Sequence, residues 1–206
     1  MEKRPDYEGA KQYALERLAR EVPPTRFYHS LAHTRNDVLP AAERLARMEG
    51  VQGDDLLCLL TATCFHDVGY IDRPDDHEVR STEIAAAVLP QFGYSAQHIA
   101  LIRALIMATK LPNNPQTLLE KIIADADMDS LGREDFLSAG LHLRHELEGL
   151  GVRISDTEWY QQQVKFLQQH TYYTEAARQI RGPGKQRNLE AVLKILEDLR
   201  RSEGQP

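Results

Sequence analysis

The chain has 206 residues, of which 42% are hydrophobic and 27% are charged, and these proportions are ordinary for a globular protein. This length fits one domain with a small extension and is enough to bury a sizeable core. The 25 Lys and Arg residues are outnumbered by 31 Asp and Glu residues, giving a net charge of −6. That balance argues against broad, charge-driven binding to nucleic acid or to an anionic membrane.

Three local features favour a cytoplasmic protein. The polar residues 1–6 lack the apolar core of a signal peptide. The longest apolar stretch, residues 56–65, is too short to cross a bilayer, so we expect no membrane partner. Cys58 and Cys64 form neither a CxxC pair nor a disulfide framework, and we expect them to be free buried thiols.

The chain reads as a succession of helices separated by Pro, Gly, Asn and Asp, without clustered alternating β-branched runs. It therefore predicts an all-α fold of roughly eight to ten helices. Up to residue 150, helical spacing of apolar residues predicts helices over 7–21, 33–48, 54–67, 77–92, 95–109, 116–128 and 133–150. The segment 54–67 is apolar nearly all round, as expected of a central buried helix, and Pro40 predicts a kink or restart in the second segment.

The C-terminal part predicts further helices without chemistry of its own. Ser155 and Glu158 form a capping box for one helix. Thr174 can cap the next, which we expect Gly182-Pro183-Gly184 to stop before a last helix over 188–201. We expect an N-terminal domain over 1–150, with 151–206 as a helical extension packed on the same domain.

Phe65-His66-Asp67-Val68-Gly69-Tyr70 stands out at the end of the buried helix. An unpaired charge there is costly, and a divalent metal ion would explain an adjacent imidazole and carboxylate. Gly69 allows the chain to turn away directly after these two side chains. On its own the His-Asp dipeptide is a weak signal, because it arises often by chance.

The neighbouring motifs strengthen that signal. Upstream lies Tyr28-His29-Ser30-Leu31-Ala32-His33-Thr34, and downstream lie His77-Glu78-x-x-Ser81, Thr109-Lys110 and Asp125-Ala126-Asp127 before Leu131-Gly132. Their order resembles the HD-domain superfamily of metal-dependent phosphohydrolases over approximately residues 25–135. The resemblance implies an HD-domain helical bundle, followed here by the C-terminal helical extension.

Carried over by position, the resemblance implies that His33, His66, Asp67 and Asp127 ligate one divalent ion. Asp125 is the alternative to Asp127, since residues two apart on a helix point in different directions. We expect His29 to position a ligand. Mn²⁺, Fe²⁺, Co²⁺, Ni²⁺ and Mg²⁺ remain open, although histidine ligands disfavour Mg²⁺.

The resemblance also implies an activity, a phosphohydrolase or phosphodiesterase. A metal-activated water would cleave a phosphoester of a small phosphorylated substrate, such as a nucleotide or cyclic nucleotide. Candidate catalytic residues are Asp67, His77, Glu78 and Lys110. Glu78 and Lys110 also have ordinary interpretations as charges that complement helix dipoles. Further candidates for phosphate contact are the arginines Arg26, Arg35, Arg73 and Arg80.

One departure from the superfamily bears on the number of ions. Members with two metals place further histidines between the His-Asp pair and the last Asp, whereas this interval holds only His77 and His98. The sequence therefore favours one metal ion and argues against a diiron oxygenase. Two other functions stay open: a regulatory module that binds metal or ligand without turnover, and a nuclease, which would need a basic track that the composition does not indicate.

Overall fold

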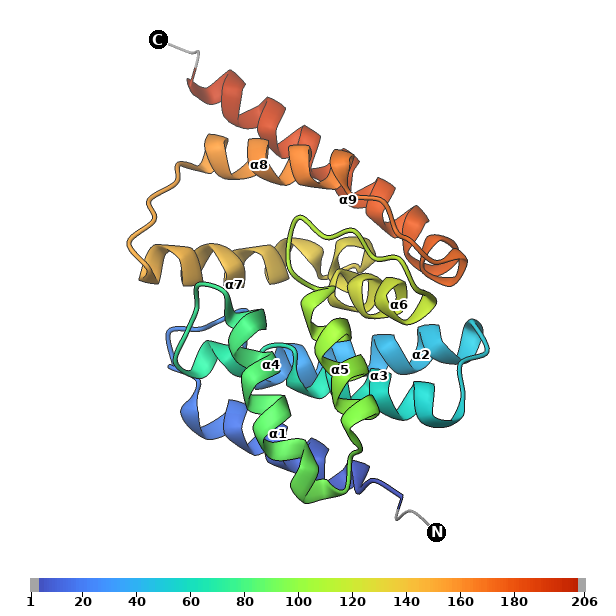
Figure 1. The fold of residues 1–206 in the computed structure, drawn as a ribbon. Helices are drawn as coiled ribbons and strands as arrows, with labels where there is room; N and C mark the ends of the chain where they lie inside the picture. The colour runs from blue at the N-terminus through green and yellow to red at the C-terminus, as the bar shows by residue number, and fades with distance from the viewer. Residues whose placement is uncertain (1–3, 204–206) are drawn as a thin grey trace. The chain divides into compact units, whose positions relative to one another are not determined.

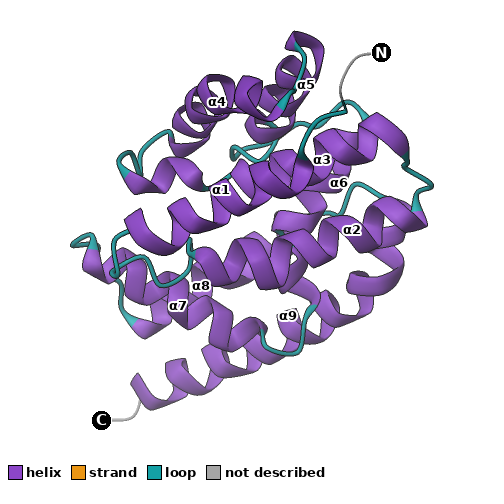
Figure 2. Cartoon of the chain, turned by 90° about the horizontal axis from the view of Figure 1, so that it is seen from below, coloured by secondary structure: helices purple, strands orange, loops and turns teal. Residues whose placement is uncertain are grey.

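The computed structural model describes residues 4–203, and within them every regular element is helical (Figure 2). This confirms the all-α class. Contacts divide the chain into two compact units, one ending at Met128 and the other beginning at Asp129. The division expected after residue 150 stays a prediction. No helix within the described residues combines the length and apolar character needed to cross a membrane.

The first unit contains six α-helices and three short helical turns among its described residues (Figure 1). In chain order they are α1 (Tyr7–Glu21), η1 (His33–Val38), α2 (Leu39–Met48), α3 (Gly53–Phe65), η2 (Val68–Ile71), α4 (His77–Val88), η3 (Leu89–Phe92), α5 (Ala96–Met107) and α6 (Leu118–Asp127). The turn η1 is a π-helix, while η2 and η3 are 3₁₀-helices.

Helix α3 forms the centre of this unit, because α1, α2, α4, α5 and α6 all contact it. Leu59, Ala62 and Phe65 are fully buried on it, which matches its nearly uniform apolar sequence. Pro40 marks a restart, since it lies in the first turn of α2 directly after the π-turn η1. Leu39, the first residue of α2, still donates its N–H to the Thr34 carbonyl oxygen, so the backbone runs on from η1 and Pro40 lies where the π-helix changes to an α-helix.

The second unit contains η4 (Asp129–Gly132), α7 (Phe136–Gly149), α8 (Asp156–Gln169) and α9 (Glu175–Glu203). Helices α8 and α9 lie side by side (Figure 1). The capping box at the start of α8 is present as predicted. The Ser155 hydroxyl accepts the N–H of Glu158, and a Glu158 carboxylate oxygen 3.0 Å away accepts the N–H of Ser155.

The expected stop at residues 182–184 is wrong, because α9 continues through Pro183. Contacts with η4 hold this part of the helix. The Arg181 guanidinium donates two hydrogen bonds of 2.8 Å to Asp129, and the Asn188 side chain donates to backbone carbonyls at 131 and 133. These tertiary bonds stabilise the helical state against the cost of Gly and Pro, which a reading of local sequence cannot weigh.

We expect Gly184→Ala to destabilise the protein and Gly182→Ala to stabilise it. A Cβ at position 184 would lie 1.9 Å from the Gly132 carbonyl oxygen, whereas a Cβ at 182 meets nothing within 4 Å. Overpacking should lower the free energy of unfolding by about 1–3 kcal/mol. Replacing a helical glycine in open space should raise it by up to about 1 kcal/mol. Urea denaturation of both variants tests this, and equal shifts would contradict the close approach.

Candidate metal centre

The end of α3 carries two polar side chains into the interior. His66 and Asp67 are 1% and 2% exposed, and they follow directly on the buried Phe65. His66 Nδ1 lies 2.8 Å from the Thr63 carbonyl oxygen, so this nitrogen carries the proton and donates it to the backbone. That bond fixes the orientation of the ring and leaves Nε2 to face the other polar side chains of the centre.

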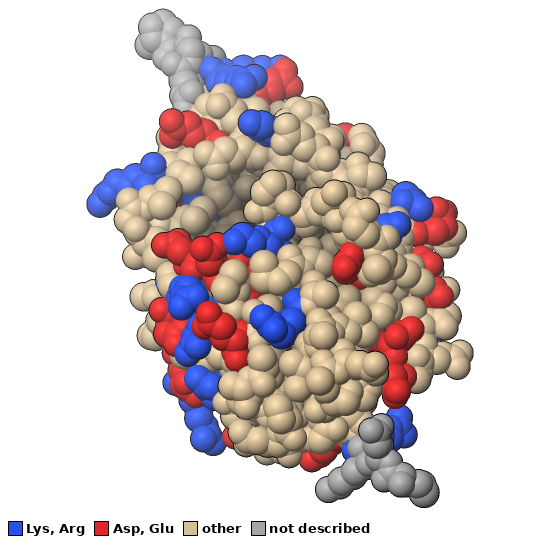
Figure 3. Space-filling view, viewed as in Figure 1, with Lys and Arg blue, Asp and Glu red and all other residues tan. Residues whose placement is uncertain are grey.

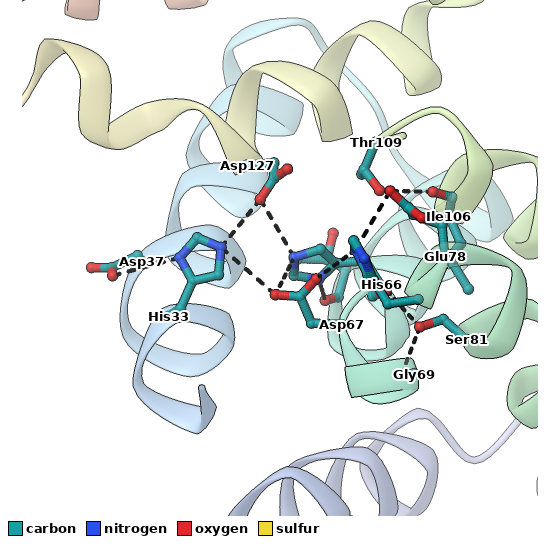
Figure 4. Close-up of polar contacts among 12 residues, drawn as sticks. His33, Asp37, His66, Asp67, Gly69, Glu78, Ser81, Ile106, Thr109 and Asp127 are labelled. Carbon is teal, nitrogen blue, oxygen red and sulfur yellow. Dashed lines mark hydrogen bonds and ion pairs between the residues drawn. The ribbon is translucent and has the colours of Figure 1, made fainter. Parts of the chain in front are cut away.

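Two further side chains reach the same point from distant parts of the chain (Figure 4). His33 comes from the first position of η1, and Asp127 from the last position of α6. Asp127 Oδ1 lies 3.2 Å from His33 Nε2 and 3.5 Å from His66 Nε2. Asp67 Oδ2 lies 3.3 Å from His66 Nε2 and 3.9 Å from His33 Nε2. Single π-turns such as η1 are rare and often occur at functional sites.

The donor atoms fit a divalent cation. His66 Nε2 and Asp67 Oδ2 are buried polar atoms without a hydrogen-bond partner, which is costly unless something else satisfies them. His33, His66 and Asp127 each offer a ligand atom within 4.8 Å of the others. Imidazole nitrogen and carboxylate oxygen together suit first-row divalent ions such as Mn²⁺, Fe²⁺ and Co²⁺.

The buried groups balance charge among themselves. Burial disfavours the charged form of His66, but the carboxylates of Asp67 and Asp127 outweigh it and raise the pKa of His66 to about 9. Burial likewise opposes ionisation of both aspartates, yet the neighbouring histidines hold the pKa of each carboxyl well below its usual range. The cluster therefore holds two anionic carboxylates and, on His66, a proton that a bound cation would have to displace at neutral pH.

The turn after Asp67 is held tightly against α4. The Ser81 hydroxyl donates to the His66 carbonyl oxygen at 2.6 Å and accepts the Gly69 N–H at 2.8 Å. A Cβ on Gly69 would lie 2.0 Å from the His77 carbonyl oxygen. Gly69 is therefore needed for close approach of the backbone to α4, and Ser81 fixes the segment that presents His66 and Asp67.

Aromatic side chains extend the site beyond the cluster. The Tyr70 ring stacks against both His29 at 4.2 Å and His77 at 4.0 Å, measured between ring centroids, and the two imidazoles are themselves 6.0 Å apart. His77 Nε2 in turn lies 3.4 Å from Asp67 Oδ1 and 3.6 Å from Glu78 Oε1. The sequence placed Tyr70 at the end of the His-Asp segment but gave no sign of its role.

The remaining candidates make other contacts. The group of potential ligands within the described residues includes Asp127 but neither Asp125 nor Asp67, although Asp67 Oδ2 lies 3.3 Å from His66 Nε2. His98 takes part in the capping box of α5. Lys110 forms an ion pair with Asp76. Among the arginines considered for phosphate contact, Arg73 pairs with Glu83, and Arg80 pairs with Asp72 and Glu83.

The HD domain model matches residues 26–130, which is half of the chain and includes all four side chains of the cluster. The chain belongs to the HD domain family. A search of curated proteins found no match to this chain.

Two crystal structures share the fold of this HD domain protein. One is of a predicted HD superfamily hydrolase from an uncultured Thermotogales bacterium, with 20% identity, a TM-score of 0.64, and coverage of 97% of this chain and 96% of that one. The other, from Lactobacillus plantarum, has 20% identity, a TM-score of 0.72, and coverage of 97% and 99%. Family membership together with a possible His/Asp metal cluster supports a metal-dependent hydrolase.

We expect the affinity for a divalent ion to rise with pH. The pKa of His66, about 9, lies above the ordinary 6.5, so the ring is protonated at pH 7 and a cation must displace that proton. Mn²⁺ affinity should therefore rise by up to about tenfold per pH unit from pH 6.5 towards 9. Calorimetry in buffers of different protonation enthalpy measures the proton released.

His98→Gln provides the control, because His98 lies outside the cluster and its loss should leave the pH dependence unchanged. Affinity that stays flat over this pH range, with no proton released on binding, would contradict the proposed protonation state of the cluster.

Proposed function

We propose that this protein is a phosphohydrolase in which His33, His66, Asp67 and Asp127 hold one divalent metal ion. The observation that carries the proposal is the convergence of two imidazoles and two carboxylates on one buried point, with His66 Nε2 and Asp67 Oδ2 lacking hydrogen-bond partners. Family membership supports the same reaction class.

A bound divalent ion would neutralise charge on the phosphoryl group and acidify the attacking water. The protein's own part is to hold the donors in place. Thr63 and Ser81 fix the orientation of the His66 ring and backbone, and both carboxylates are held in the ionised form that a cation requires.

His77 and Glu78 are the candidates for general acid and base. Asp67 has one oxygen near the ligand imidazoles and the other 3.4 Å from His77 Nε2, which is also 3.6 Å from the buried Glu78 carboxylate. A continuous set of titratable groups thus leads from the proposed ligands to Glu78. Such an arrangement suits proton transfer to the leaving oxygen or from the attacking water.

We propose a small phosphorylated substrate, such as a nucleotide or cyclic nucleotide, with Lys110 as a phosphate contact. Basic and acidic side chains are interspersed on the face seen in Figure 3, and no continuous basic stripe crosses the described residues there. This face thus offers no extended basic track of the kind that a long nucleic acid needs, and the net charge of −6 likewise favours a small substrate. The similar Thermotogales structure is named a predicted hydrolase, in line with this proposal.

The test compares Asp67→Asn with Asp55→Asn, an exposed aspartate near the opposite end of α3. Elemental analysis identifies the metal, and a panel of nucleotides, cyclic nucleotides and phosphodiesters measures hydrolysis with Mn²⁺. Losing a metal ligand should lower kcat/KM about 100-fold or more, because metal stabilisation of the transition state is worth several kcal/mol. The control should retain full activity.

Two outcomes would contradict the proposal. Hydrolysis that persists in Asp67→Asn and after chelation of divalent ions would contradict a metal-dependent mechanism. Tight binding of Mn²⁺ and of phosphorylated ligands without turnover over the whole panel would instead favour the regulatory module.

A further inference from the structure

Lys110 and Asp76 form an exposed ion pair, and Asp76 directly precedes the candidate residue His77. Lys110 Nζ donates to Asp76 Oδ1, with the two side chains 39% and 60% exposed. Lys110 also lines an open groove of about 540 Å³ beside the loop between α5 and α6. The ammonium group can therefore be reached by a ligand from solvent, and its present partner is a carboxylate of the protein itself.

The backbone of Asp76 is in an unusual conformation. Among residues 4–203 it is the non-glycine residue with a positive φ, 58° with ψ of 36°. It is also the N-cap residue of α4, a position where an aspartate usually accepts a backbone N–H of the first turn. Here its side chain makes no capping bond and reaches Lys110 instead. The loop thus holds a carboxylate against Lys110 and leaves the helix end uncapped.

The pair lies next to residues of the proposed reaction. Asp76 directly precedes His77, whose Nε2 is 3.4 Å from Asp67 Oδ1. The charge of the buried Glu78 also acts on Lys110. An anion that binds Lys110 would therefore lie beside His77 and Glu78, at the edge of the site.

A phosphate should be able to replace the Asp76 carboxylate at Lys110. An exposed carboxylate–ammonium pair contributes little, because water screens it and two flexible side chains must be ordered. A phosphate dianion carries more charge and more acceptor oxygens, so its hydrogen bonds to an ammonium are stronger.

We propose that Asp76 is an internal competitor for phosphate at Lys110, and so a residue that sets the affinity for phosphorylated ligands. This rests on the proposed function. The ligand's phosphate displaces the Asp76 carboxylate from Lys110, and the carboxylate returns when inorganic phosphate leaves. Asp76 thus weakens binding of substrate and speeds release of product.

The experiment measures binding of inorganic phosphate to the Mn²⁺-loaded protein by calorimetry. Asp76→Asn should tighten phosphate binding about fivefold, and Lys110→Gln should weaken it. In the Lys110→Gln background, Asp76→Asn should not tighten phosphate binding further, since Asp76 competes with phosphate only at Lys110. Asparagine tolerates a positive φ, so the loop conformation should persist, and thermal unfolding checks this.

Asp75→Asn is the matched control, because it removes the same charge from the adjacent exposed position. It should change phosphate affinity less than about twofold, given screening between exposed charges in water. The inference would be overturned if Asp75→Asn raised phosphate affinity as much as Asp76→Asn does. It would also be overturned if Asp76→Asn still raised phosphate affinity in the Lys110→Gln background.

The two proposals fail in different ways. Absence of Mn²⁺ binding by the unmodified protein overturns the proposed function, and the inference with it. Mn²⁺ binding and hydrolysis by the unmodified protein, with phosphate affinity unaffected by Asp76→Asn, overturns the inference alone.

Discussion

The first unit depends on how charge is accommodated at the buried end of α3. His66 and Asp67 follow an almost wholly apolar helix and are removed from water, where an isolated charge costs far more than one domain can offset. The imidazoles of His33 and His66 and the carboxylates of Asp67 and Asp127 make that burial possible by pairing with one another. Each of the three chain segments that meet there needs the others to be in place.

This requirement explains the local geometry around the cluster. The π-turn η1 positions His33, the end of α6 positions Asp127, and Ser81 holds the turn after Asp67 against α4. Oriented donors of this kind lower the cost of assembling a coordination sphere, because little rearrangement is left for the moment of binding. A buried set that already holds its carboxylates ionised suits a cation better than any neutral ligand.

The edge of the site follows a different physical rule. Lys110 and Asp76 are exposed to water, and their pairing is weak enough to be exchanged, whereas His33, His66 and Asp67 of the cluster are buried. His77 directly follows Asp76 in the chain and lies 3.4 Å from Asp67, so it is connected to both groups. The site therefore combines a fixed donor set with an adaptable charged edge, as the proposed turnover of a small anion requires.

Much of this could be read from the chain. Helical spacing and Pro/Gly punctuation predicted the all-α class, and the uniform apolarity of the segment before His66 predicted a central buried helix. The order of His33, His66-Asp67 and Asp127 was enough to suggest the family. These features are local or depend on spacing, and residue type alone determines them.

Tertiary structure decided what depends on contacts between distant segments. Helix α9 continues through Pro183 because Arg181 and Asn188 bond to η4, about 50 residues earlier in the chain. Contacts also placed Tyr70 against both His29 and His77, and turned the carboxylate of Asp76 from the helix end to Lys110. The sequence by itself determined which residue types lie at the end of α3. Only packing decided which of their atoms contact His33 and Asp127, because those contacts depend on how whole helices are placed relative to one another.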